Sequence, residues 1–205
     1  MKLKIPFFKQ TTLLNCGPSA LRMVLAYFGR NFGIEILEER TGIKEGKGIS
    51  TIQIATAVAS LEYKTDFYSK HILFNEEHLN LDFYKKYGDI DNLEQSKKLV
   101  EEAKMVGVNV QEKTLSLEEL LVFVTKDSVP IVLLDWNIVR GNKEKGYQGH
   151  FVPIVGYDRK NVYVHNHGFN NPQKFLSITK SIFDKARKAE GTDEDMVVIY
   201  RSKRQ

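Results

Sequence analysis

Apolar residues recur at helical spacing through the first third of the chain. Over residues 16–28 they appear every three to four positions, after Asn15, a favoured helix N-cap, and before Gly29, which ends helices. The pattern returns over 31–42 and again over 50–61, where a serine stands at the expected cap. We therefore predict three helices before the first long strand.

Beyond residue 115 the pattern changes from helical to β. Ser116 and Glu119 form a capping box for one more helix, and 129–134 is a continuous apolar run rich in β-branched residues, typical of a buried strand. Further segments fit strands at 63–68, 150–157, 161–166, near Phe175 and at 196–200, with a polar loop at 137–149 and a helix at about 179–189. Helices first and strands afterwards predict an α+β fold, with a helical N-terminal half packed on an antiparallel sheet.

Residues 71–106 are helical in pattern and strongly charged, in two pieces around 87–89. We expect an inserted helical hairpin within a single domain that spans 1–205. As a solvated cover it would pack through five apolar side chains and expose two histidines: Leu79, Phe83, Leu93, Leu99 and Val100, and His71 and His78. The alternative is a lid or a substrate-docking arm.

Charge and cysteine content restrict the partners and the compartment. The 205 residues carry a formal net charge of +4, with basic and acidic residues interleaved, and we expect the basic tail at 201–204 to be solvated, without a nucleic-acid partner. The single cysteine excludes an intramolecular disulfide and fits a reducing compartment. No window approaches the roughly 20 apolar residues of a membrane span, and the N-terminus lacks a signal-peptide pattern. We therefore expect a cytoplasmic location and no membrane partner.

The cysteine, Cys16, falls in the first turn of the first predicted helix. A lone cysteine is commonly a small buried hydrophobe, but the partial positive charge of a helix N-terminus favours the nucleophilic thiolate. Six residues upstream, the side-chain amide of Gln10 is placed to donate to an oxyanion, together with the backbone N–H of Cys16. The stretch therefore predicts a nucleophile beside its own oxyanion hole.

A hairpin in the second half predicts a base for this cysteine. If its turn lies at 158–160, two apolar pairs face each other: Val152 with Val164, and Ile154 with Val162. The same register sets His150 directly opposite Asn166, on one face of the sheet. The carboxamide oxygen of Asn166 would accept from the imidazole of His150 and hold its Nε2 toward the sulfur, as the third group of a triad does.

Together these residues resemble the bacteriocin-processing peptidase family C39, of the papain-like superfamily. The resemblance is carried by Gln10, Cys16–Gly17, Gly149–His150–Phe151 and the polar residue Asn166, and it leaves about 63–115 without a motif. It implies a papain-like fold, a peptide or protein substrate and no cofactor, with Cys16 as nucleophile, His150 as base and Gln10 in the oxyanion hole. The family has an aspartate followed by a proline where this chain has Asn166 and His167.

Three alternatives stay open. Papain-like acyltransferases form the same thioester and pass the acyl group to another nucleophile, and a catalytically inactive member of the fold would only bind peptides.

His165 and His167 flank Asn166 and should point to the opposite face, where two histidines can share a metal ion. They lack a third ligand at recognisable spacing, so we predict ordinary strand residues and no metal site. Trp136 would either line the cleft near His150 or pack in the core.

Overall fold

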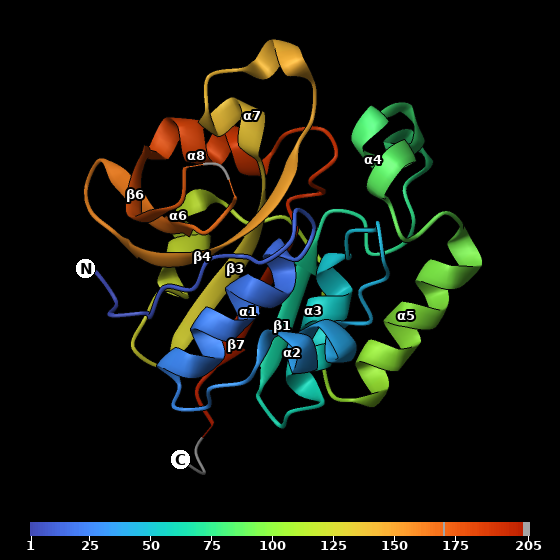
Figure 1. Cartoon of the computed structure of the whole chain (residues 1–205), viewed down its shortest axis with the longest axis horizontal. Coiled ribbons are helices and arrows are strands. Elements are labelled where there is room, and N and C mark those ends of the chain that lie inside the picture. The colour runs from blue at the N-terminus through green and yellow to red at the C-terminus, as the bar shows by residue number, and fades with distance from the viewer. Residues whose placement is uncertain (170, 203–205) are drawn as a thin grey trace.

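A single seven-stranded sheet forms the centre of the computed structural model, with the strand order β2-β1-β7-β3-β4-β5-β6 (Figure 1). The structure describes residues 1–169 and 171–202, so Lys203 and Arg204 of the predicted basic tail lie outside it. All eight residues of the central strand β3 are buried, which requires cover on both faces of the sheet. The helices α1 and α3 pack on β4 and β1, and α8 packs on β3. The predicted α+β class, with a helical N-terminal half, is confirmed.

The helices lie where their patterns place them. Their bounds are α1 (Cys16–Tyr27), α2 (Ile34–Thr41), α3 (Thr51–Ala59), α4 (Asp82–Tyr87), α5 (Leu93–Met105), α6 (Leu117–Val122), α7 (Trp136–Val139) and α8 (Lys180–Arg187), with short 3-10 turns η1 (Glu76–Asn80) and η2 (Lys143–Lys145). The predicted capping box forms at Ser116 of α6, and Ser50 lies at the predicted cap of α3, where it too forms a capping box. The segment 137–149, predicted as a loop, contains most of α7 and all of η2.

The strands are β1 (Thr65–Ser69), β2 (Asn109–Glu112), β3 (Ser128–Asp135), β4 (Gly149–Tyr157), β5 (Asn161–Asn166), β6 (Gln173–Thr179) and β7 (Met196–Tyr200). All pairs in the sheet are antiparallel except β1 with β2, which is parallel. The sequence pattern did not predict β2, a four-residue edge strand without a buried residue. Among the described residues, no helix has the length and apolar character that crossing a membrane requires.

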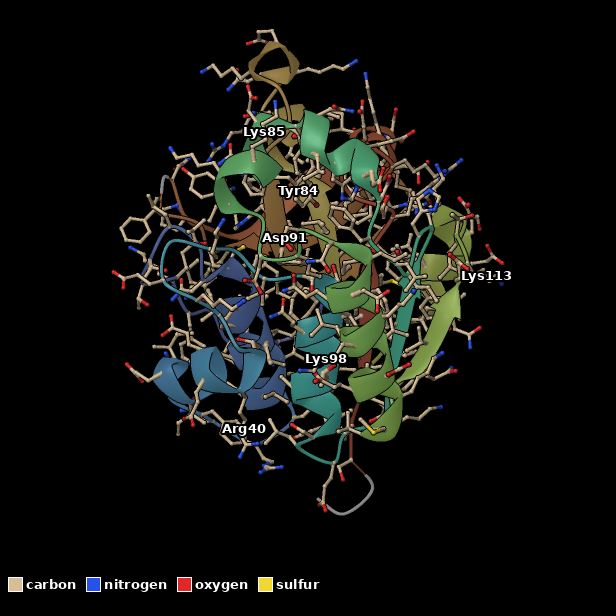
Figure 2. The ribbon with its side chains drawn as sticks, turned by 90° about the vertical axis from the view of Figure 1, so that its right-hand side faces the viewer. Arg40, Tyr84, Lys85, Asp91, Lys98 and Lys113 are labelled. Atoms are coloured by element: carbon tan, nitrogen blue, oxygen red, sulfur yellow. The ribbon has the colours of Figure 1, made fainter. Side chains whose placement is uncertain are left out.

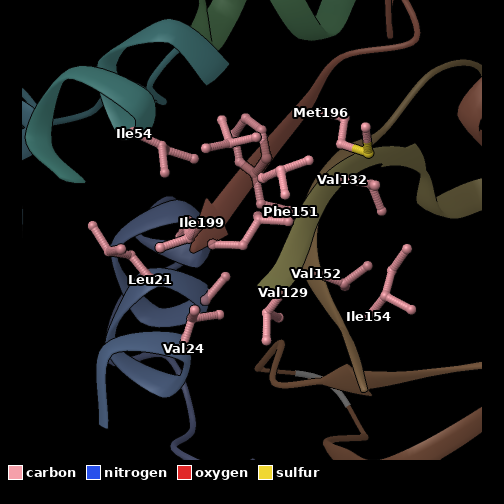
Figure 3. Packing of buried hydrophobic residues seen from close by; sticks show 14 of the residues in the cluster. Leu21, Val24, Ile54, Val129, Val132, Phe151, Val152, Ile154, Met196 and Ile199 are labelled. Carbon is pink, nitrogen blue, oxygen red and sulfur yellow. The ribbon is translucent and has the colours of Figure 1, made fainter. Parts of the chain in front are cut away.

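The core joins the first helix to the strands of the second half (Figure 3). Leu21 and Val24 of α1 are fully buried, as are Ile154 of β4 and Ile199 of β7. Removing each such side chain from water contributes about 1.5–3 kcal/mol. This packing fixes the N-terminal end of α1, where Cys16 lies, against β4, where His150 lies.

The helical segment between β1 and β2 comprises η1, α4 and α5 (Figure 2). Val100 is buried against the core, as predicted, but Leu79 and Leu93 are both 44% exposed. These two packing predictions are wrong, because Leu79 lies in η1, which has no buried residue, and Leu93 lies on the outer face of α5. Of the two histidines, His71 is exposed as expected, whereas His78 is largely buried against Tyr84 and Asp193.

The register between β4 and β5 differs from the predicted one. Ile154 pairs with Val164 instead of Val162, and a bulge follows between Ile154 and Gly156. The cause lies in the N-terminal segment, which the local pattern could not reveal. The N–H of Leu3 donates to the carbonyl of Val155 at 2.7 Å, and Lys2 bridges Gly156. Antiparallel strands with a bulge bend and shift their pairing at such a point.

Continuing this register places His150 one diagonal step from Asn166, rather than directly across from it. Diagonal neighbours on one face still lie within reach of long side chains. The predicted register is therefore wrong, but the predicted shared face of His150 and Asn166 is correct.

Candidate functional site

A cavity of about 670 Å³ opens beside the N-terminal end of α1. Gln10, Cys16 and His150 line it, and so does Trp136, whose indole packs edge-on to the imidazole of His150 with centroids 4.7 Å apart. Asn166 contacts His150 from outside this cavity. The structure therefore gathers the four predicted residues in one region, and Trp136 takes the cleft-lining position, although it is also buried.

Cys16 is the first residue of α1 and is half-buried. Asn15 occupies the predicted N-cap position, but its side chain makes no capping hydrogen bond. Its Oδ1 instead accepts from the N–H groups of Thr11 and Thr12, at 3.2 and 3.1 Å, and its Nδ2 donates to Glu38 at 2.6 Å. The fully buried Asn15 thus fixes the turn that carries the chain from Gln10 into the helix.

The ionisation of Cys16 also differs from the prediction. Burial raises the pKa of its thiol, although the N–H groups of Phe151, Gly17 and Cys16 itself lie near the sulfur and oppose the shift. The helix N-terminus stabilises the thiolate as expected, but desolvation outweighs it. The resting cysteine is therefore a thiol, whose sulfur lies next to the backbone of Phe151 and hence beside His150.

His150, on β4, is buried, and its pKa is lowered well below the usual value. Desolvation is the main cause, the charges of His167 and Arg140 add to it, and a hydrogen bond with the side chain of Asn166 opposes it. Its Nε2 is buried without a hydrogen-bond partner among residues 1–169 and 171–202. The imidazole is therefore neutral at rest.

Asn166 is held at the end of β5 by its own contacts. Its Nδ2 donates to the carbonyl of Asn171 at 2.7 Å, and its Oδ1 accepts from the N–H of Gly168 at 3.2 Å. Because the interaction with Asn166 favours the charged form of His150, the oxygen is the atom that faces the imidazole. The sequence predicted a contact between these two side chains, and the orienting role of Asn166 stays a prediction.

Gln10 is buried beside Cys16, and its N–H groups are already engaged. Its Nε2 donates to the carbonyls of Thr12 at 2.8 Å and Leu13 at 3.3 Å, and its Oε1 has no partner in the described part of the chain. Its backbone N–H donates to the carbonyl of His167 at 3.0 Å, which ties this segment to the end of β5. An oxyanion beside Cys16 would compete with the carbonyl of Leu13 for one N–H of Gln10, the one that makes the longer bond of 3.3 Å.

His167 is a residue whose position the sequence did not predict. It was expected on the face opposite His150, but its ring centroid lies 5.0 Å from that of His150. The reason is that β5 ends at Asn166, so the alternation of faces does not extend to residue 167. Its Nε2 lies 2.9 Å from the carbonyl oxygen of Cys16, a contact that connects the two halves of the site. The sequence contained one hint that residue 167 is unusual, because this chain has a histidine where the C39 family has a proline.

The alternative of a metal site finds no ligand set. His165 uses both ring nitrogens, with Nε2 3.0 Å from the carbonyl of Ile5 and Nδ1 accepting from the N–H of Phe175. Within the described part of the chain, no three His, Cys, Asp or Glu side chains are grouped so that they could hold a metal ion.

The far wall of the cavity comes from the segment at 71–106 and from the turn before β7. Phe83 and Tyr84 of α4 contribute aromatic rings, and Asp193 and Asp195 contribute carboxyl groups. The segment predicted as a solvated cover therefore lines the cavity, as a substrate-docking arm would.

Comparison by sequence and comparison by structure give two different kinds of relative. The matches by sequence are guanylyl cyclases. Residues 5–199 match the sequence profile of a family described as guanylylate cyclase. The chain is also similar to Guanylyl cyclase 1 of Arabidopsis thaliana, with 24% identity over 212 residues that cover 96% of this chain and 76% of the plant protein.

Among solved structures, the similar ones are C39 peptidase domains. A double-glycine-motif protease from an AMS/PCAT transporter, solved with its leader peptide, matches with a TM-score of 0.54 at 15% identity, over 98% of this chain and 94% of that one. A protein from Bacillus anthracis described as a C39-like peptidase gives 0.53 at 14% identity, over 98% of each chain. The peptidase domain of Streptococcus ComA gives 0.51 at 14% identity, over 95% and 96%. At these identities the likeness concerns the fold, which is that of papain-like C39 domains.

Proposed function

This chain belongs to the guanylylate cyclase family, and we propose that it is a cysteine hydrolase, on a fold like that of C39 peptidase domains, which cleaves an amide bond in a peptide or protein. The observation that carries the proposal is that Cys16 and His150 line one cavity while the side chain of Asn166 contacts the imidazole of His150. A thiol, an imidazole and a group that orients the imidazole are the parts that nucleophilic catalysis by cysteine requires.

The proposed reaction begins with a neutral pair. Burial keeps Cys16 as a thiol and His150 as a neutral imidazole, so the proton moves as the sulfur attacks rather than beforehand. The Sγ–H bond breaks, the sulfur bonds to the substrate carbonyl carbon, and the proton goes to the imidazole of His150. Asn166 stabilises the imidazolium that forms.

Collapse of the tetrahedral intermediate completes the first half. The backbone N–H of Cys16 and one side-chain N–H of Gln10 donate to the oxyanion and stabilise it. For this, the side chain of Gln10 breaks its hydrogen bond to the carbonyl of Leu13. The C–N bond breaks, and His150 returns its proton to the leaving amine. Water then adds to the thioester, with His150 again accepting and returning the proton, and releases the acid. An added amine in place of water would make the protein an acyltransferase.

Intact mass spectrometry tests the proposal directly. Incubation with a mixed library of short peptide amides should give products whose formation is lost in Cys16→Ala and falls at least 100-fold in His150→Ala, because general-base catalysis contributes about 10²–10⁴-fold. Arg201→Ala, far from the cavity, serves as a control with unchanged activity. Products that form equally in Cys16→Ala would overturn the nucleophilic role. Peptide binding without any turnover would instead indicate a peptide-binding module.

A second candidate is guanylyl cyclase activity, favoured by the family and by the name of the Arabidopsis relative. Lys44, Lys47, Lys85 and Arg140 line the cavity and would meet a triphosphate. Lys44 is neutralised by Asp89 at 2.8 Å, however, and the carboxyl groups of Asp193 and Asp195 would repel a polyanion. Production of cyclic GMP from GTP and Mg²⁺, unaffected by Cys16→Ala and reduced by Lys47→Ala, would establish this activity in place of the hydrolase.

A further inference from the structure

A carboxyl group outside the predicted machinery faces the same cavity. Asp195 lies directly before β7, and its backbone carbonyl accepts from the N–H of Leu133 at 3.1 Å. Leu133 in turn pairs with Phe151, whose N–H lies at the sulfur of Cys16. The strand β3 therefore lies between the backbones of Asp195 and Phe151. Two strand spacings of about 4.8 Å each put these backbones about 10 Å apart.

One oxygen of the Asp195 side chain lacks a partner. Its Oδ1 is buried without a hydrogen-bond partner in the described part of the chain. Burial raises the pKa of Asp195 to about 7, and the charge of Asp193 adds to the shift, while the hydroxyls of Ser69 and Thr51 and the imidazole of His78 oppose it. Thr51 lines the same cavity. Such an arrangement is stabilised by a ligand that brings positive charge or N–H donors.

The neighbouring carboxyl group, that of Asp193, lies next to a histidine. Nε2 of His78 lies 3.2 Å from Asp193, and its ring stacks on Tyr84 with centroids 4.5 Å apart. Tyr84 stacks in turn on Tyr147 at 5.4 Å, and Tyr147 packs against Gly149, next to His150. These aromatic rings connect the surroundings of His150 with the carboxyl groups, where Oδ1 of Asp195 has no hydrogen-bond partner in the described part of the chain.

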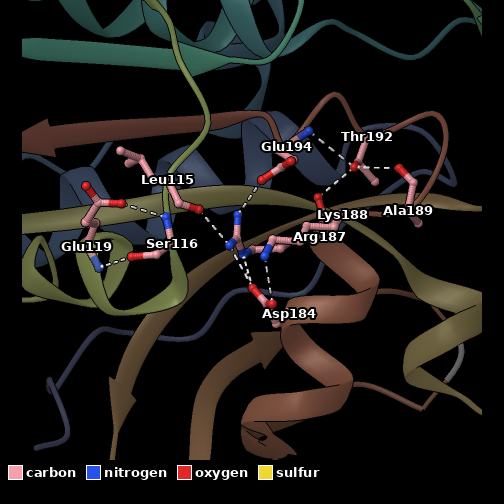
Figure 4. Close-up of polar contacts among 9 residues, drawn as sticks. All are labelled: Leu115, Ser116, Glu119, Asp184, Arg187, Lys188, Ala189, Thr192 and Glu194. Carbon is pink, nitrogen blue, oxygen red and sulfur yellow. Dashed lines mark hydrogen bonds and ion pairs between the residues drawn. The ribbon is translucent and has the colours of Figure 1, made fainter.

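The turn that carries Asp195 is held firmly in an unfavourable conformation. Asp193 and Glu194 both have positive φ, at 46° and 53°, which side chains other than glycine adopt only when the surroundings impose it. Arg187, 3% exposed, imposes it by donating to Glu194 at 2.9 Å and to the carbonyl of Leu115 at 2.7 Å (Figure 4). Thr192 adds bonds to two carbonyls at the end of α8. Backbone strain of this kind clusters at functional sites.

We infer that the Asp195 end of the cavity is a subsite for a cationic amine of the substrate, on a strand whose backbone lies about 10 Å from that of Phe151 beside Cys16. The inference rests on the proposed function, since it names the substrate of the same site. An α-ammonium group and a lysine side chain share this chemistry. The aromatic rings beside the subsite lower the local dielectric constant and strengthen the attraction between the ammonium and the carboxylate.

Binding to Cys16→Ser protein tests the subsite without requiring catalysis. The probes are Ala-Ala-Ala-Ala amide, its N-acetylated form, and N-acetyl-Ala-Lys-Ala-Ala amide. Trp136, the only tryptophan in the chain, lines the cavity, so its fluorescence reports occupancy. At least one cationic peptide should bind ten-fold or more tightly than the neutral one. Preference for the free N-terminus or for lysine identifies which source of the amine the subsite takes.

Two variants locate the effect. Asp195→Asn should abolish the ten-fold preference, and Asp193→Asn, which asparagine tolerates at positive φ, should reduce it. Asp82→Asn is the matched control, because that carboxylate is almost fully exposed on α4 and pairs only with Lys85. Equal binding of all three peptides, no binding of any, or a preference that survives Asp195→Asn would overturn the inference. A preference in Cys16→Ser protein without cleavage by the wild type would contradict only the hydrolase proposal.

Discussion

Nε2 of His167 lies 2.9 Å from the backbone carbonyl oxygen of Cys16. Nδ1 of the same ring lies 3.1 Å from the carbonyl of His165, so the fully buried imidazole bridges two acceptors. Burial lowers the pKa of His167 to about 4, and a neutral ring carries one N–H, which can serve only one of the two carbonyls. This contact holds the first turn of α1 against the end of β5, and thereby sets the nucleophile relative to His150.

The low pKa of His167 predicts that the protein loses stability in mild acid. A histidine whose folded-state pKa lies below its unfolded value binds fewer protons when folded, so its full contribution is present above about pH 6.5 and is lost as the pH falls toward 4. The shift corresponds to a loss of up to about 3 kcal/mol. Urea unfolding between pH 4 and 7.5 measures it. His167→Gln should flatten the slope, and equal slopes in both proteins would contradict the assignment.

Alkylation of Cys16 should behave as that of a buried thiol. Because burial raises the pKa of Cys16, the rate of reaction with iodoacetamide should still be rising above pH 9, where an exposed cysteine is already largely thiolate. The chain has one cysteine, so intact mass reports this site alone. A fast reaction well below pH 8 that disappears in His150→Ala would show a preformed ion pair, and would refute the neutral resting state.

Asn166→Asp should convert the neutral pair toward an ion pair. A carboxylate in place of the carboxamide would raise the pKa of His150 by roughly one to three units, because an opposite charge within hydrogen-bonding range favours the imidazolium. The pH profile of Cys16 alkylation should move downward accordingly. Asn161→Asp places the same charge at the other end of β5 and should leave the profile unchanged. A profile that moves equally in both variants would reflect general charge rather than contact with His150.

Arg187→Ala should be among the most destabilising substitutions in the chain. Arg187 is buried and pairs with Asp184 at 2.7 Å and Glu194 at 2.9 Å (Figure 4). Removing it leaves Glu194 and the carbonyl of Leu115 without their partner, at a cost of about 3–5 kcal/mol, whereas Asp184 keeps its pair with Lys188. Arg201→Ala breaks an exposed pair with Asp127 and should cost about 1 kcal/mol or less, which urea unfolding can distinguish. Similar losses in the two variants would contradict this account of the turn before β7.

Elements with local signals were predictable from the sequence. The capping boxes at Ser50 and Ser116 each need only four consecutive residues, and both form. The apolar stripe of α1 and the continuous run of β3 depend on side-chain spacing, which the backbone geometry fixes. The shared face of His150 and Asn166 followed from the same alternation, although the register did not.

The sequence by itself determined the order of helices and strands and the residues that the site gathers, because periodicity and capping act within a few residues. The tertiary structure decided the protonation states of Cys16 and His150, since desolvation depends on what packs around a group, and this outweighed the helix N-terminus. It also decided the bulge in β4, the approach of His167 to Cys16 and the unpaired carboxyl group of Asp195. Each of these depends on contacts between segments far apart in the chain, which no local pattern encodes.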